Sequence, residues 1–373
     1  MVKWRNYLNV RRLAGLSILV GFMLNSGLGR ADSWQHAVSS RASTEFDSNP
    51  AMSPAYPGGV WRALFEPGYT LTGRVGANEL KAGLALQLVR SSNRARSQNR
   101  DSPSVFLNWL RQSDAGEFGI SSRYEEIATR DAAIEAIGSV PIDSTRASRS
   151  ISGSWSKALS ERSTLSADGS YEGVSYRGGT FIDYVTRSGG LRFNYALSEH
   201  SVPFLRMSYA EYEPAGGNLP HSFANAILGW NWKPSDYLEG NLQVGRTRAS
   251  GQEMTTLGAA AMRYTGQRTV LVLNADHQLL PSGLGDFVTV DQVNGKWSYD
   301  LSERSRTGID LGWRKNRLVN IVNRTKGAWL QHELNPLWGA RTYYLHSINE
   351  GGAGGSASSN ILGLTLIYNR SDF

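Results

Sequence analysis

The sequence contains no cysteine among its 373 residues, which excludes a disulfide-bonded scaffold, a thiolate metal site and a cysteine nucleophile. It also lacks any stretch of about 20 apolar residues, and its mean hydropathy is −0.35, so a helical protein with several membrane spans is excluded. Charged residues are sparse at 19%, whereas aromatic residues reach 10%. Low charge with many aromatic residues argues against a disordered chain.

The N-terminal segment has the composition of a secretory signal. An apolar run over residues 13–24 is followed by small residues up to Ala31 and is preceded by basic residues, namely Lys3, Arg5, Arg11 and Arg12. The alternative is a membrane anchor, but a run of about 12 residues is short for a bilayer span. We therefore predict a signal peptide over residues 1–31, cleaved after Ala31, and a single domain over residues 32–373.

Cleavage at this site changes the charge of the chain. Five of the 39 basic residues and none of the 32 acidic residues lie in residues 1–31, so the formal charge falls from +7 to +2. Most of the apparent basicity therefore belongs to the signal, and we expect no nucleic-acid partner.

The rest of the sequence alternates apolar and polar residues with period two, which is typical of strands with one apolar face. Leucine or alanine occupies every second position of residues 80–88, and residues 148–156 carry serine at every second position. Such segments run for about 10–13 residues, and a tilted strand needs about 9–11 residues to cross a bilayer.

The connections between these segments alternate between two kinds. Short turns, such as residues 159–162 and 301–304, alternate with longer loops, such as residues 47–60 and 90–103. Outer-membrane barrels place short turns in the periplasm and long loops outside the cell. We predict an all-β fold, a transmembrane up-and-down antiparallel β-barrel of about 18 strands in the bacterial outer membrane; 16 strands is the alternative.

Aromatic residues near strand ends support insertion into a membrane, because barrels carry aromatic girdles at both interfaces. These residues are Trp61, Trp109, Trp155, Tyr195, Trp230, Trp232, Trp297, Trp313 and Tyr368. The C-terminal Phe373 is also typical of such barrels, although it is out of phase with Leu362, Leu364 and Leu366 unless a bulge intervenes.

Several turn and loop motifs resemble one group of Gram-negative outer-membrane β-barrels. They are the repeated Leu-Ser-Glu-(Arg/His)-Ser turns, residues 46–50 (FDSNP) and residues 178–184 (GGTFIDY). The group accompanies exopolysaccharide synthesis and exosortase (PEP-CTERM) systems, and the resemblance covers roughly residues 36–373. It implies a conduit or accessory in exopolysaccharide export, with polysaccharide and periplasmic export components as further partners.

Motifs for covalent chemistry are missing from the sequence. None of the six histidines has a metal-ligand spacing, and there is no G-x-S-x-G elbow and no P-loop. We predict no enzyme activity and no cofactor, although a hydrolase with Ser, His and an acid on adjacent strands stays open as an alternative.

The inward-facing side chains are the candidate functional residues. By alternation the lumen-lining set is Lys81, Arg123, Glu125, Asp168, Glu172, Arg192, Arg206, Glu239, Asp310 and Arg314. Both signs of charge occur in similar numbers, which argues against a strongly ion-selective channel. Tyr184, Tyr209 and Tyr212 could stack on sugar rings or belong to the interface girdle.

Four functions fit these features: a conduit or accessory for exopolysaccharide export, a general diffusion porin for small hydrophilic solutes, a lumen-plugged structural barrel, and a barrel enzyme. In each, outer-membrane lipid, lipopolysaccharide and the barrel assembly machinery are expected partners.

Overall fold

A computed structural model describes residues 33–55, 58–114, 116–129, 144–178, 181–216, 220–251, 253–351 and 355–371. The expected signal peptide and Phe373 lie outside these residues. Within the described ranges, no helix has the length and apolar character needed to cross a membrane.

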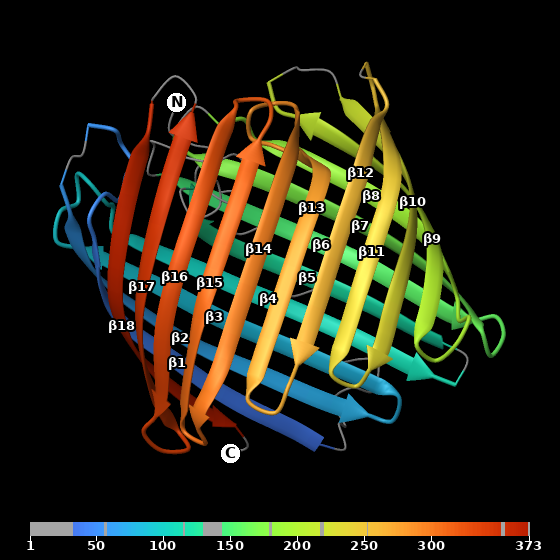
Figure 1. Ribbon diagram of the computed structural model, residues 1–373, viewed down its shortest axis with the longest axis horizontal. Helices are drawn as coiled ribbons and strands as arrows, with labels where there is room; N and C mark the ends of the chain where they lie inside the picture. Colours follow the sequence, from blue (N-terminus) through green and yellow to red (C-terminus); the bar gives the residue numbers. More distant parts are fainter. Residues whose placement is uncertain are drawn as a thin grey trace, which may run out of the picture.

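The described chain forms strands almost throughout (Figure 1). They are β1 (Ser33–Asp47), β2 (Val60–Val75), β3 (Asn78–Ser91), β4 (Arg100–Ser113), β5 (Gly116–Ala128), β6 (Thr145–Ala158), β7 (Ser163–Arg177), β8 (Tyr184–Tyr195), β9 (Ser201–Pro214), β10 (His221–Ser235), β11 (Leu238–Ala249), β12 (Thr255–Thr265), β13 (Thr269–Pro281), β14 (Phe287–Ser302), β15 (Ser305–Asn316), β16 (Ile321–Glu333), β17 (Trp338–Gly351) and β18 (Ala357–Ser371).

These strands make one closed antiparallel sheet of 18 strands, in which each strand pairs with its neighbours in sequence. The ring closes because β1 pairs with β2 on one side and with β18 on the other, from Ala37 opposite Ser371 to Asp47 opposite Ile361. Figure 1 shows tilted strands around one axis, with the orange and red β13–β18 in the front wall. The predicted fold class and the count of 18 strands are confirmed.

The two faces of the wall differ as the alternation predicts. On β6, Ile151 and Trp155 are exposed, while the serines of the same strand point to the opposite face. Large apolar side chains are exposed on the outer face around the ring, for example Leu84, Leu228 and Leu311. A wall that is apolar outside and polar inside satisfies a lipid environment on one side and water on the other.

Several strand ends differ by three or four residues from the expectation of the alternation; β17, for example, ends at Gly351 and β18 begins at Ala357, where the alternation predicts 347 and 361. The alternation predicts a strand from residue 181, but β8 begins at Tyr184, because Asp183 accepts a hydrogen bond from the Tyr176 amide (2.8 Å) and Ile182 donates to the Gly283 carbonyl (2.9 Å). The sequence also predicts a strand from residue 325, whereas β16 begins at Ile321, because two apolar residues (Ile321 and Val322) followed by two polar ones (Asn323 and Arg324) do not alternate.

A buried ionic network joins the strands where the barrel closes. Arg62 on β2 bridges Glu45 (2.5 Å) and Asp47 (3.1 Å) on β1, and these three side chains are only 5%, 9% and 4% exposed. The Tyr343 hydroxyl on β17 donates a hydrogen bond to Glu45 (2.5 Å), and the Ser359 hydroxyl on β18 donates one to Asp47 (2.5 Å). The first two strands are thus tied to the last two by side chains as well as by the backbone ladder.

Removal of the Arg62 cation should weaken the contact between the first and last strands of the barrel. Because Arg62→Met removes the cation that bridges two buried carboxylates, we expect the free energy of unfolding to fall by about 3–5 kcal/mol. Urea unfolding of the barrel in lipid vesicles measures the effect. The matched control is Arg74→Met, which breaks the exposed Arg74–Glu79 pair (2.7 Å) and should cost at most about 1 kcal/mol. Equal losses in the two variants would contradict this role for Arg62.

Candidate functional site: the barrel lumen

The register places all ten candidate lumen residues on the face opposite the exposed apolar side chains. Directly paired residues share a face of the sheet. Thus Lys81 lies opposite Thr72 and Asn108, while its neighbours Leu80 and Ala82 lie opposite Trp109 and Leu107.

A charged cluster on β7, β8 and β9 holds three of the candidates. Arg206 pairs with Asp168 at 2.9 Å, and Arg192 lies directly opposite Arg206 in the register. The Arg192 guanidinium lies 3.6 Å from the centre of the Phe204 ring, a cation–π contact. This ring covers Gly229 on β10, where a Cβ atom would come within 2.1 Å of it. The cluster therefore holds one cation paired with an acid and a second cation on an aromatic ring.

Three further acidic candidates have basic partners. Glu125 pairs with Arg123 on the same strand (2.7 Å), Glu172 pairs with Arg146 (3.1 Å), and Glu239 faces Arg263 (3.8 Å). Arg146 and Arg263 are not among the sequence-predicted residues. The alternation of β6 could have identified Arg146, because Arg146 continues the even-numbered positions of the inward-facing serines. The run of alanines in β12 gives no such alternation, so the sequence does not show which face Arg263 occupies.

The last two candidates lie across the barrel from this cluster. Asp310 is opposite Lys296, and Arg314 is opposite Gln292 and Asn323. Acids and bases thus both occur around the inner wall.

The inner wall of β10, β11, β13 and β14 is rich in side-chain amides. Asn241 donates to Asn231 (2.5 Å), and Gln243 donates to Asn241 (2.6 Å). Gln292 likewise donates to Asp276 (2.6 Å). Amides offer both donors and acceptors, so this wall can replace the water around an uncharged polar solute.

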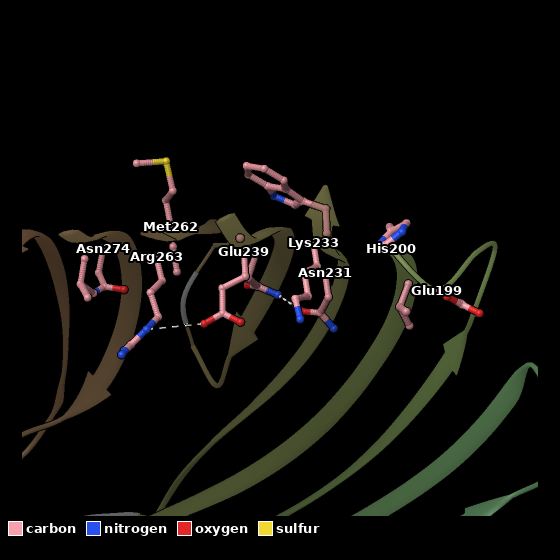
Figure 2. Close-up of a pocket in the computed structure, with 14 residues that line it drawn as sticks. Glu199, His200, Asn231, Lys233, Glu239, Met262, Arg263 and Asn274 are labelled. Carbon is pink, nitrogen blue, oxygen red and sulfur yellow. Dashed lines mark hydrogen bonds and ion pairs between the residues drawn. The ribbon is translucent and has the colours of Figure 1, made fainter. Parts of the chain in front are cut away.

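A recess of about 390 Å³ lies at the short-turn end of the amide-rich wall. Figure 2 shows Arg263 and Glu239 pointing toward each other, while Met262 points to the other side of the wall. His200 from the β8–β9 turn and Lys233 from the end of β10 also line the recess. The charged pair is about half exposed, with Arg263 at 52% and Glu239 at 59%, and is therefore accessible to a solute.

The tip of the β13–β14 hairpin crosses the barrel at the long-loop end. The Tyr212 hydroxyl on β9 donates to the Ser282 carbonyl (2.7 Å), and the Tyr212 ring lies 5.2 Å from that of Phe287. Since β10, β11 and β12 lie between β9 and β13 in the sheet, this contact bridges part of the opening. The hairpin tip narrows the lumen there.

Sugar stacking, one of the two alternatives for Tyr184, Tyr209 and Tyr212, is not supported by their positions. Tyr184 and Tyr212 are buried and pack on each other with ring centres 5.1 Å apart, so their faces are covered. Tyr209 is exposed on the outer face, where it donates to Glu211.

A serine–histidine contact lies on the outer face of the described part of the wall. Ser305 and His332 approach to 2.9 Å at the short-turn end, and both are solvent-exposed in that contact. Among the described residues, no carboxylate is hydrogen-bonded to His332, and no group of three or more His, Asp or Glu side chains could hold a metal ion. The contact lacks the orienting acid of a nucleophilic triad.

Solved structures show what this fold is similar to. The chain matches the outer membrane protein opdK from Pseudomonas aeruginosa with a TM-score of 0.53 and 11% identity, over 91% of this chain and 99% of that chain. It matches OccAB2 from Acinetobacter baumannii with a TM-score of 0.53 and 12% identity, over 91% and 98%. A structure of Pseudomonas aeruginosa OpdK with vanillate gives 0.51 and 11%, over 91% and 99%.

No family model and no curated protein matches the chain. At these identities the solved structures show the fold alone, and that fold is an 18-stranded outer-membrane β-barrel. The apolar outer face and the polar inner face place it in a bacterial outer membrane. The association with exopolysaccharide or exosortase systems stays a prediction.

Release of the hairpin tip should widen the lumen. Phe287→Ala removes the ring that packs on Tyr212 and on Phe223 (4.9 Å), a loss of about 3–5 kcal/mol of local packing. We expect single-channel conductance to rise and to fluctuate more. Phe65→Ala, on the exposed outer face, is the matched control and should leave conductance unchanged. An unchanged conductance for a folded Phe287→Ala barrel would show that the tip is not the constriction.

Proposed function

We propose that the protein is a passive outer-membrane channel, a porin for small hydrophilic solutes. The single observation that carries this proposal is the closed 18-stranded wall with a polar inner face of mixed charge. An 18-stranded barrel is wide enough for an aqueous lumen unless loops or side chains fill it. The ten candidate residues are the lining of that lumen in this proposal.

The lining supports passage by exchange of hydrogen bonds. A solute that leaves bulk water meets the serines of β6, the amides of β10 and β11, and ion pairs such as Arg206–Asp168. Most charges are paired, so a solute can replace one partner for a short time without the full cost of desolvation. Binding remains weak enough for release, as conduction requires.

The size of the solute follows from the hairpin tip across the long-loop opening. The contact from Tyr212 to Ser282 favours small solutes over a continuous polymer chain. The neighbour OpdK was solved with vanillate, a small organic molecule, which supports the same size class.

Conductance in planar bilayers tests the proposal. We expect purified protein to give stable open channels with weak ion selectivity, since the lumenal charges nearly balance. The absence of conductance from a folded barrel would contradict the proposal and favour a lumen-plugged structural barrel.

We expect the charged cluster on β7, β8 and β9 to determine the weak ion selectivity of the channel. Arg192→Gln removes the cation held on Phe204, so the reversal potential in a salt gradient should shift toward cation preference. The matched control is Arg187→Gln on the same strand, because Arg187 lies on the outer face and pairs with Glu213 (3.1 Å). Equal shifts in the two variants would show that Arg192 does not face the conducting path.

A further inference from the structure

The recess at the short-turn end contains an ion pair whose two members are not hydrogen-bonded to each other. Arg263 on β12 and Glu239 on β11 are directly opposite in the register, but their nearest N and O atoms are 3.8 Å apart, which is too far for a hydrogen bond. By contrast, Arg306 and Asp300, on the same inner face and also at the short-turn end, are hydrogen-bonded at 2.5 Å. The donors of Arg263 and the acceptors of Glu239 are therefore open to a third group.

Amide side chains frame this pair on the adjoining row of the inner wall. That row joins Asn241, Ala261 and Asn274, which are directly opposite one another on β11, β12 and β13. Because Ala261 is small, the wall is hollow between two amides that stand two strand spacings, about 10 Å, apart. Asn274 makes no hydrogen bond to another described residue, and Figure 2 shows it on the same side of the wall as Arg263 and Glu239.

The other charged residues around the recess have partners or belong to other strands. Lys233 lines the recess but pairs with Asp236 (3.6 Å). Glu199 comes from the β8–β9 turn, and β10 separates that turn from β11. The next cation along the row of Arg263 is Lys296 on β14, which lies opposite Asp310. The centre of the recess thus presents one cation and one anion side by side.

We propose that this recess binds a small zwitterion of the α-amino-acid class. The carboxylate of the solute accepts hydrogen bonds from the Arg263 guanidinium and from the Asn274 amide, and its ammonium group donates to the Glu239 carboxylate. A guanidinium can bind a carboxylate through two parallel hydrogen bonds. The volume of about 390 Å³ equals that of about 13 water molecules, so a small amino acid fits.

A zwitterion satisfies this pair better than a solute with a single charge. An anion that separates Arg263 from Glu239 leaves the carboxylate without a counter-charge, and a cation leaves the guanidinium without one. A zwitterion replaces each partner by a group of the same charge, whereas an uncharged solute offers no charge to either side chain. The inference rests on the proposed aqueous lumen, for which it names a class of solute.

Binding of L-alanine to the purified barrel in detergent tests this inference, and saturation-transfer NMR measures such weak binding. The comparison probes are N-acetyl-L-alanine, which lacks the ammonium group, L-alaninamide, which lacks the carboxylate, and glycerol, which is uncharged. We expect each to bind at least about tenfold more weakly than L-alanine, because each lacks at least one charged hydrogen bond. Arg263→Gln and Glu239→Gln should each lower the affinity for L-alanine by at least about tenfold, for the same reason. Both side chains are about half exposed, so neither substitution should prevent folding.

The matched control is Arg306→Gln, which removes a cation from the same face and the same end of the barrel. It should bind L-alanine as the unchanged chain does. Equal L-alanine binding by Arg263→Gln and the unchanged chain, or binding of glycerol or N-acetyl-L-alanine as tight as that of L-alanine, would overturn the proposal. Conductance of the same protein separates the two proposals. A conducting barrel that does not bind L-alanine keeps the channel and loses this site, whereas a silent barrel that binds L-alanine keeps the site and loses the channel.

Discussion

Backbone hydrogen bonding in lipid is the constraint on which this structure depends. Hydrocarbon offers no partner for an exposed amide or carbonyl, so a spanning sheet must have no free edge. The pairing of β1 with β18 removes that edge and fixes the strand order around the ring. The Arg62 network at the closure then supplies charge-assisted hydrogen bonds where the two ends of the chain meet.

Closure also decides how each side chain is used. Once the ring is formed, alternate residues face two different solvents, and the same strand must satisfy both. Inward charges are met mainly by partners on neighbouring strands, as with Asp168 and Arg206. Outward charges such as Arg187 and Glu213 lie near the long-loop ends of their strands. The proposed permeation and the insertion into lipid therefore use opposite faces of one wall.

The sequence predicts the parts of this arrangement that depend on local periodicity. Alternation over residues 148–156 correctly indicates strand β6, and similar patterns give 18 strands in order. It does not predict contacts between distant strands. The packing of Phe287 on Tyr212, which narrows the lumen, joins residues from β14 and β9 that no local pattern connects. Arg263 is missed for a different reason: it lies on the strand next to that of Glu239, but the alanines of β12 obscure the alternation there.

The absence of cysteine makes the central claim directly measurable, because single cysteines can be introduced without background labelling. In intact outer membranes, a small membrane-impermeant maleimide should label Ser150→Cys and Ser152→Cys, which lie on the inner face of the wall. It should not label Ile151→Cys, which faces lipid, until the membrane is dissolved. Equal labelling at all three positions, or labelling of Ile151→Cys alone, would contradict a channel with a polar lumen.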